Sequence, residues 1–279
     1  MTLIRAARPA DMAAVRGIAA GFDLLGAWPS QPDFLDLERE TGRLVVADVA
    51  DVAGGVARVV GFAGALTRGG LTHLGDLFID PGTQSAGLGR RLLEAVLPGP
   101  GHPVVTFASS DPRALSLYLR QGLRPRQPLW YLGGGAAALP DAPAEIRPAT
   151  ADDIAELDAE VSGGHRVEHL AWYLDQPGVA AWRTPGGYAV TRVHGDRCAV
   201  GPAGGHDADA TVRAVLAAAR EAAGSVRAAR SVHLAVFAAH SLAAVLVGAG
   251  FRITDQDTFM ATPGSPLDTD RYVPDADLG

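Results

Sequence analysis

The sequence has 279 residues, which is long for one compact domain and suits two domains of roughly 140 residues each. Hydrophobic residues make up 48% and charged residues 20%, so both halves can bury a core and general disorder is excluded. The formal net charge is −7, whereas nucleic-acid-binding proteins usually carry a basic surface, so we expect no nucleic-acid partner. All 24 basic side chains are arginines, which excludes a lysine nucleophile or Schiff base.

The sequence favours a cytoplasmic protein without a membrane partner. The opening residues MTLIRAARPADM lack the apolar run of a signal peptide, and no window approaches about 18 uninterrupted apolar residues. The single cysteine, Cys198, cannot form an internal disulfide, which fits a reducing compartment. Because Cys198 lies among alternating apolar residues, we expect it to be buried and structural.

In chain order, the first half contains segments in which apolar and polar residues alternate and segments in which apolar residues have helical spacing. The patterns predict strand 3–6, helices 9–21 and 32–41, strands 43–49, 57–66 and 71–80, helix 87–97, strand 103–109, helix 112–121 and strand 123–132. Strands that come first in a run and then alternate with helices indicate a mixed sheet flanked by helices. The predicted fold class is therefore α/β, of the mixed α+β kind.

The second half repeats the opening of the first. Residues 4–12 and 146–154 both read as a short strand, a turn with aspartate and a helix start. Residues 117–123 and 245–251 both read as a helix that ends at a glycine before a strand. A glycine-, alanine- and proline-rich stretch lies between the copies. We therefore expect a domain at 1–134, a linker at 135–144 and a similar domain at 145–279.

The most informative segment is 71–93, where a predicted strand enters a glycine-rich turn that opens a helix. The free N–H groups of residues 84–90 would lie at the helix N-terminus, which attracts anions. Three phosphate-binding patterns compete. A dinucleotide fingerprint would need a third glycine where Leu92 stands, and a P-loop needs a lysine, so neither fits. The third pattern, Q-x-x-G-x-G, is met by Gln84, Gly87 and Gly89.

These motifs resemble those of the Gcn5-related N-acetyltransferase (GNAT) family. The run 76–81 followed by Gln84–Gly89 resembles motif A of that family. Residues 111–123 resemble motif B, with Ala114, Tyr118 and Gly122 in register. Asp111 replaces the usual asparagine and Leu123 the usual phenylalanine. An aspartate still caps a helix, but it removes the donor that asparagine offers to pantetheine.

The resemblance implies a metal-free enzyme that uses acetyl-CoA as co-substrate and a small-molecule or peptide amine as acceptor. Backbone groups of Leu77, Phe78 and Ile79 would bind the pantetheine and polarise the acetyl carbonyl. The full set of cofactor-binding residues that it implies is Leu77, Phe78, Ile79, Gln84, Ser85, Ala86, Gly87, Leu88, Gly89, Arg90, Asp111 and Ala114.

Three residues are candidates for proton transfer. The resemblance makes Tyr118 the general acid that protonates the leaving thiolate. His73 and Asp76 are alternatives for the group that accepts a proton from the amine or anchors it. Strict alternation would place His73 with Gly75, Leu77 and Ile79 on one face of the strand, and Asp76 with Leu74 and Phe78 on the other.

Other segments lead to weaker expectations. The resemblance implies that the segment after the first helix builds the acceptor site. There the acids Asp33, Asp36, Glu38 and Glu40 could line a mouth for a cationic amine, but we interpret them as one solvated face of a helix. The second half has no Q-x-x-G-x-G turn and has Leu246 where Tyr118 is expected, so we interpret it as a non-catalytic copy. Residues 263–279 read as an extended surface strap. An acetyl-CoA sensor without turnover and transfer of a longer acyl chain remain alternatives, and a homodimer is left open.

Overall fold

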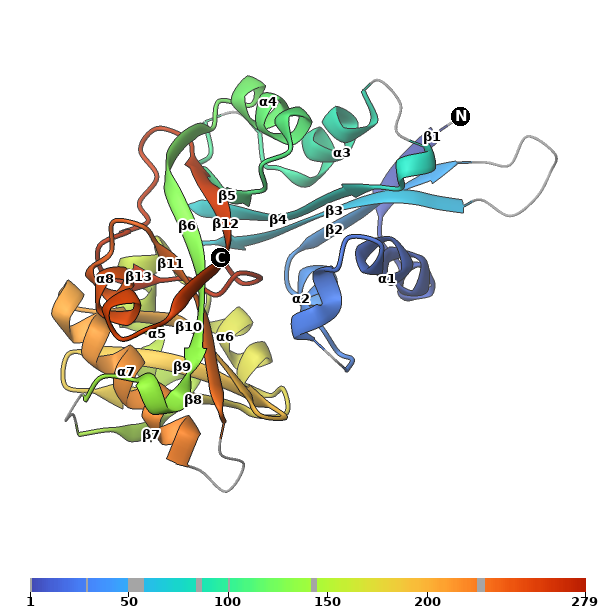
Figure 1. Cartoon of the computed structure of the whole chain (residues 1–279). Coiled ribbons are helices and arrows are strands. Elements are labelled where there is room, and N and C mark those ends of the chain that lie inside the picture. The colour runs from blue at the N-terminus through green and yellow to red at the C-terminus, as the bar shows by residue number, and fades with distance from the viewer. Residues whose placement is uncertain are drawn as a thin grey trace.

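The computed structural model describes residues 2–28, 30–49, 58–83, 87–99, 101–141, 145–224 and 229–279 (Figure 1). The first half contains β1 (Thr2–Ala6), α1 (Met12–Ala20), α2 (Phe34–Glu40), β2 (Arg43–Val49), β3 (Arg58–Arg68), β4 (Leu71–Ile79), α3 (Leu88–Val96), β5 (Val104–Ala108), α4 (Pro112–Arg120) and β6 (Arg124–Gly135). The helices and strands expected here are therefore found, with ends that differ by a few residues.

The second half repeats this order element by element. It contains β7 (Arg147–Ala149), α5 (Ala151–Ser162), α6 (Val167–Leu174), β8 (Val179–Thr184), β9 (Gly187–His194), β10 (Arg197–Gly205), α7 (Ala208–Gly224), β11 (Ser231–Phe237), α8 (Ser241–Gly248) and β12 (Arg252–Ala261), followed by the short β13 (Tyr272–Val273). The two halves therefore share the same order of helices and strands. None of the described helices is long and apolar enough to cross a membrane.

All the strands form one continuous sheet, in the order β1-β2-β3-β4-β5-β12-β6-β11-β10-β9-β8-β7 with β13 beside β10. The last strand of each half has crossed to the other half. Thus β12 pairs antiparallel with β5, and β6 pairs antiparallel with β11, while β12 and β6 pair with each other. The copies are therefore joined by exchanged strands as well as by a connecting segment.

Helices cover both faces of the first-half strands. In Figure 1, α3 and α4 lie on one face and α1 and α2 on the other. The start of α4 is fixed locally, because Asp111 accepts a hydrogen bond from the Arg113 backbone N–H at 2.8 Å and Pro112 occupies the first helical turn. In the second half Cys198 is fully buried, as expected, and burial raises the pKa of its thiol to about 12.

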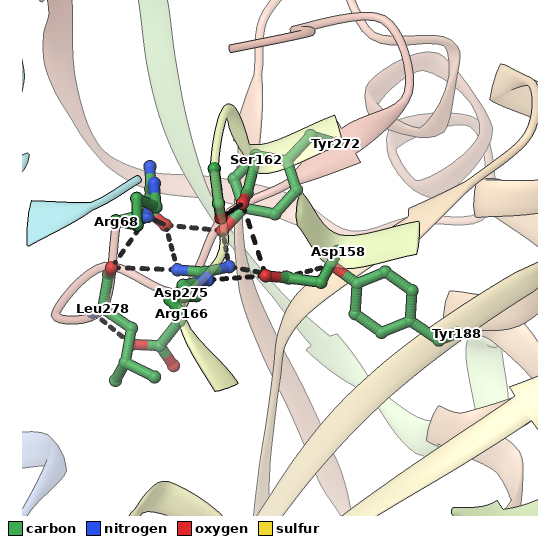
Figure 2. Close-up of polar contacts among 10 residues, drawn as sticks. Arg68, Asp158, Ser162, Arg166, Tyr188, Tyr272, Asp275 and Leu278 are labelled. Carbon is green, nitrogen blue, oxygen red and sulfur yellow. Dashed lines mark hydrogen bonds and ion pairs between the residues drawn. The ribbon is translucent and has the colours of Figure 1, made fainter. Parts of the chain in front are cut away.

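The C-terminal segment is not a surface strap, and that prediction is wrong. Tyr272 and Val273 pair with β10, and the following residues return to the interior, where Leu278 is fully buried. Figure 2 shows the polar network that holds this segment. The guanidinium groups of Arg68 and Arg166 each donate to the backbone oxygen of Gly279, at 2.6 and 2.8 Å. These buried donors explain why the segment does not remain in solvent.

One acid forms an ion pair with a buried arginine of this network. Asp158 of α5 forms an ion pair with Arg166 at 2.8 Å and accepts a hydrogen bond from the Tyr188 hydroxyl at 2.5 Å. The Tyr272 hydroxyl donates to the Gly279 backbone oxygen at 2.5 Å. Because Arg68 belongs to β3, this network ties the second half and the C-terminal segment to the first-half sheet.

The same segment makes the two halves differ at one place in the sheet. The parallel strands β4 and β5 pair only over 72–74 and 104–106, and beyond this they have no registered partners in each other. The equivalent strands β10 and β11 pair over 197–199 and 231–233. Beyond that pairing, β13 adds to β10 through Ala203–Val273 and Gly204–Tyr272. The opening present in the first half is therefore filled by backbone in the second.

Candidate active site

A cleft of about 1550 Å³ lies where β4 and β5 separate. Its lining comes from β4, α3 and α4, the segment between α1 and α2, and also β12 and the C-terminal segment. All three residues with an expected role in proton transfer, His73, Asp76 and Tyr118, line this one cleft. The sequence therefore identified residues that the fold brings together.

The backbone of β4 presents polar groups to the cleft. The N–H of Asp80 donates to the carbonyl of Val60 in the β3–β4 ladder. Because the backbone groups of alternate residues point to the same side of a strand, those of Phe78 and Asp76 also face β3. The N–H and C=O groups of Leu77 and Ile79 consequently point to the other edge, where β5 has diverged. Phe78 was expected to offer backbone groups as well, but its backbone faces β3 and it contributes its side chain to the lining.

The N-terminus of α3 opens at the same cleft. Gly87 caps the helix with φ of 98°, a conformation that strains any other residue type. Gly89 packs closely, since a Cβ there would lie 3.5 Å from both Ile79 and Leu117. The backbone N–H groups of Leu88, Gly89 and Arg90 have no partner within the helix and can bind an anion. Gln84, Ser85 and Ala86, which the motif includes, lie outside the described residues.

Charged side chains frame this end of the cleft. Arg90 lines the cleft and forms an exposed ion pair with Glu94 at 2.7 Å. Asp111 and Ala114 of motif B also line it, and the Asp111 carboxylate pairs with Arg113 at 2.7 Å. The carboxylate of Asp111 is thus engaged in capping and in an ion pair.

Tyr118 projects from α4 and is only 7% exposed. Burial raises the pKa of its hydroxyl above the ordinary value, and the nearby charge of Asp76 raises it further. The phenol therefore keeps its proton at neutral pH. That is the protonation state that a general acid needs.

A β-bulge corrects the predicted faces of β4. Gly64 is opposite Asp76 and Ala65 is opposite Leu74, so Gly75 is an extra residue without a registered partner. Leu74 consequently packs in the cluster beneath α3 and α4 together with Leu77 and Ile79.

The other face carries the remaining β4 side chains. There, Phe78 contacts Phe22 with ring centroids 5.0 Å apart, Asp76 meets Glu38 of α2, and His73 contacts Phe107. The expected grouping of His73 with Leu77 and Ile79 is therefore wrong, because the bulge moves His73 and Asp76 to one face.

His73 is 1% exposed and is not solvated. Its ring lies 5.0 Å from that of Phe107, and neither ring nitrogen has a hydrogen-bond partner among the described residues. Burial, followed by the charges of Arg68 and Arg166, lowers its pKa well below the ordinary value. A Cβ added to Gly279 would lie 2.4 Å from the ring, so the C-terminal segment packs directly on His73.

Glu38 lies beside the site, whereas the sequence analysis favoured a solvated position for it. It is 1% exposed, and Asp33 and Asp36 are also buried, so the predicted solvated helix face is wrong. Asp33 forms an ion pair with Arg16 at 2.7 Å, and Asp36 pairs with the same arginine. Only Glu40 of this group behaves as a surface side chain.

Among the described residues, no cation pairs with the Glu38 carboxyl group. This group lies beside that of Asp76, and neither of its oxygens has a hydrogen-bond partner in the described part of the chain. The carboxyl group occupies the space above two glycines, because a Cβ on Gly64 or Gly75 would lie 1.7 or 2.6 Å from it. Burial raises the pKa of Glu38 well above its ordinary value and that of Asp76 to about 7.

The second half contributes a further set of residues that the sequence missed. Asp255 and Asp257 of β12 line the cleft, and so does Asp277 of the C-terminal segment. The Tyr131 hydroxyl donates to Asp257 at 2.7 Å, and the Trp28 indole N–H donates to Asp277 at 2.6 Å. Burial, and then the charge of Asp275, raises the pKa of Asp277 to about 7. No sequence signal placed these acids here, since only the strand exchange brings β12 beside β5.

Residues 38–130 match the family model described as the acetyltransferase (GNAT) domain. The strands β4 and β5 that border the cleft lie within these matched residues, so this part of the chain is similar to the acetyltransferase (GNAT) domain. No group of three or more metal-ligating side chains occurs in the described part of the chain.

Solved structures share the fold over nearly the whole chain. A candidate acetyltransferase of Pyrococcus horikoshii is 16% identical, with a TM-score of 0.71 over 100% of this chain and 96% of that one. A GCN5-related N-acetyltransferase of Kribbella flavida is 18% identical, with a TM-score of 0.58 over 94% and 70%. A tandem GNAT protein from the clavulanic acid biosynthesis pathway is 15% identical, with a TM-score of 0.57 over 94% and 98%. A search of the curated proteins found no match.

Proposed function

We propose that this protein is an N-acetyltransferase that moves the acetyl group of acetyl-CoA to a primary amine of a small molecule or peptide. The observation that carries the proposal is the meeting, in one cleft, of the β4 edge, the open α3 N-terminus, Tyr118 and Asp76. A diphosphate would bind the N–H groups of Leu88, Gly89 and Arg90, and the pantetheine would add to the β4 edge at Leu77 and Ile79. Gln84, Ser85 and Ala86 would extend the anion site.

The reaction is a direct transfer without a covalent enzyme intermediate. The neutral amine attacks the acetyl carbonyl carbon, a C–N bond forms and the C–S bond breaks. A β4 backbone N–H at Leu77 would stabilise the oxygen that becomes negative during attack. Tyr118 donates its proton to the departing thiolate, and its raised pKa keeps that proton in place until then. The proton that the attacking nitrogen loses as the amide forms returns to the tyrosine phenolate.

Asp76 is our choice for the proton acceptor. An amine that is protonated at neutral pH must lose one proton before it attacks, and a carboxyl group with a pKa of about 7 is well matched to that step. His73 is neutral but is enclosed by Phe107 and Gly279, so we assign it to packing of the acceptor end. Glu38, whose carboxyl group lies beside that of Asp76, would share the proton that Asp76 accepts.

The second half would bind no acetyl-CoA. Its equivalent opening is occupied by β13, and α7 has the acid Asp209 in its first turn, where a diphosphate would be repelled. We propose that this half instead supports the first and completes its acceptor site. We retain the domain limits 1–134 and 145–279 as a proposal for the sequence repeat, although the exchanged strands cross that boundary.

Two alternatives use the same cleft. A sensor would bind acetyl-CoA without turnover, and an acyltransferase could use a longer acyl chain. A buried, protonated Tyr118 beside an acid favours catalysis over sensing, since binding alone needs neither group. We propose acetyl transfer as the activity and place the protein in the cytoplasm.

Calorimetry with acetyl-CoA tests the cofactor site. We expect one molecule bound per chain and a loss of affinity of at least about tenfold in a Gly87→Glu variant, because a carboxylate would repel the diphosphate at a backbone angle that only glycine adopts freely. A Gly101→Glu variant is a matched control, since Gly101 also has positive φ, at 90°, but does not line the cleft. Equal affinity in Gly87→Glu and wild type would contradict the proposal.

A further inference from the structure

The acceptor end of the cleft has an excess of acidic side chains. Asp76, Asp255, Asp257 and Asp277 line the cleft, Glu38 lies beside Asp76, and all of them except the exposed Asp255 are buried or half-buried. No ion pair joins any of them to an arginine or histidine of the described residues. The charge of Arg192 lowers the pKa of Asp277, but its guanidinium group stacks on Trp28, with the guanidinium carbon 3.9 Å from the ring centroid. Buried acids without cations are costly unless a ligand supplies the charge.

Glu38 points to the same end and is itself unsatisfied. It is 1% exposed, and its Oε1 would be 2.6 Å from a Cβ on Gly75, a residue that lines the cleft. His73, also 1% exposed, lines the cleft with both ring nitrogens unpartnered among the described residues. Two deeply buried polar side chains without partners indicate a site built for a polar ligand rather than a solvated acidic surface.

The acids fall into two groups that lie on different parts of the chain. Asp76 belongs to β4, near Tyr118, and is the group that faces the reacting nitrogen. Asp257 and Asp277 come from β12 and the C-terminal segment and receive hydrogen bonds only from neutral donors, Tyr131 and Trp28. The charge of Asp277 acts on Asp76, so the two groups are close neighbours in one cleft.

We infer that the amine acceptor carries a second cationic group and that Asp257 and Asp277, supplied by the second half, bind that group. The inference rests on the proposed acetylation of a primary amine and names its substrate class, an α,ω-diamine or a related polycation. Aromatic rings of Phe34, Phe107 and Tyr131 line the same end and would cover the methylene chain between the charges. The second half thus supplies specificity without supplying chemistry.

Acetyl transfer to three acceptors of matched length tests this inference. The probes are 1,4-diaminobutane, 4-aminobutan-1-ol and 4-aminobutanoate, with release of the CoA thiol as the readout. Each has a primary amine at one end, and they differ in bearing a cation, a neutral hydroxyl or an anion at the other end. We expect kcat/KM for the diamine to exceed that for the amino alcohol by at least about tenfold, with the amino acid slowest.

An Asp257→Asn variant should lower the ratio of diamine to amino alcohol kcat/KM at least about fivefold. Asparagine keeps the acceptor for the Tyr131 hydroxyl, so the fold is retained. Glu221→Gln removes one negative charge from an exposed position of α7 outside the cleft and should leave the ratio unchanged. A ratio near one in the wild type, or an unaltered ratio in Asp257→Asn, overturns the inference.

Calorimetric titration of the same amines into protein with CoA separates this inference from the proposed function. Tighter binding of the diamine with no thiol release from acetyl-CoA would retain the cation site and reject acetyl transfer. Turnover of all three amines at similar rates would retain acetyl transfer and reject the cation site. Neither turnover nor a preference in binding would reject both.

Discussion

Burial acts on Tyr118 and Asp76 in one cleft from different starting values. It raises the pKa of the phenol, which is already protonated at neutral pH, and raises that of the carboxyl group to about 7. At neutral pH the tyrosine can therefore give a proton, while a large fraction of Asp76 can take one. Groups in one cleft whose environments give them well-separated pKa values are suited to acid and base roles.

Replacing Tyr118 tests the acid. We expect Tyr118→Phe to lower kcat at least about tenfold, since thiolate would then leave without a positioned proton donor. Affinity for acetyl-CoA should stay within about twofold, because the ring and its packing remain. Steady-state thiol release and calorimetry measure the two quantities separately, and an unchanged kcat would remove Tyr118 from the mechanism.

The pH profile of kcat/KM tests the base. With Asp76 as proton acceptor, activity should rise as pH increases through about 7, because the deprotonated carboxylate is the active form. After burial, the charge of Asp277 is a cause that raises the pKa of Asp76, so Asp277→Asn should move this rising limb to lower pH. The groups that face Asp76 are Glu38, Asp33, Asp277 and Tyr118. A limb that does not move, measured with one acceptor across pH 5–9, would point to another base.

For single residues, the sequence predicted the position of those that belong to a motif but not of common residue types outside a motif. Gly87 and Tyr118 were predicted because their spacing relative to the turn and helix is specific. Glu38 was read as a solvated acid, since helical spacing alone does not show which face meets a sheet. Its burial depends on the space that Gly64 and Gly75 leave on neighbouring strands.

At the scale of elements, the bulge in β4 and the two glycines beneath α2 together position the carboxyl groups of Asp76 and Glu38. The extra residue Gly75 turns Asp76 towards α2, and Gly64 on β3 leaves room for the Glu38 carboxyl group. A side chain larger than hydrogen at either glycine would displace that group. The position of the proposed base is therefore set by three elements together.

A double-mutant cycle tests this construction. Gly64→Ala alone should cost about 2 kcal/mol of folding free energy, because its methyl group would overlap the Glu38 carboxyl group. The same substitution in a Glu38→Ala background should cost much less, since the space is then free. Urea unfolding of the four proteins gives the coupling energy, and equal costs in both backgrounds would contradict the steric account.

The predicted order of helices and strands was confirmed in the first half, but the predicted faces of β4 were wrong. A period-two pattern assumes an uninterrupted ladder, and an inserted glycine has no side chain that could reveal the change of phase. The element boundaries differ by few residues because caps and glycines mark them in the sequence. The strands' partners, by contrast, depend on contacts between residues far apart in the chain.

At the scale of the whole molecule, the exchange of β6 and β12 merges two repeats into one sheet. Sequence alone predicted two similar halves joined by a linker, and no local pattern distinguishes a strand that pairs with its own half from one that crosses over. The acids of β12 therefore appeared unrelated to the cleft. The non-local pairing that hid them is what makes the second half part of the site.

The exchange predicts that the two halves unfold together. Differential scanning calorimetry should give a single transition with calorimetric and van't Hoff enthalpies in agreement, because neither half keeps its complete set of strands without the other. Acetyl-CoA should shift the whole transition to higher temperature, although we propose that it binds only to the first half. Two resolved transitions, with only one shifted, would show that the halves fold independently.

The exchanged strands also make each half depend on the other. Deleting the second half would take β12 away from β5, leave a hydrogen-bonding edge bare at the centre of the sheet and remove Asp257 from the cleft. Substitutions within the second half can preserve the sheet, whereas loss of that half cannot.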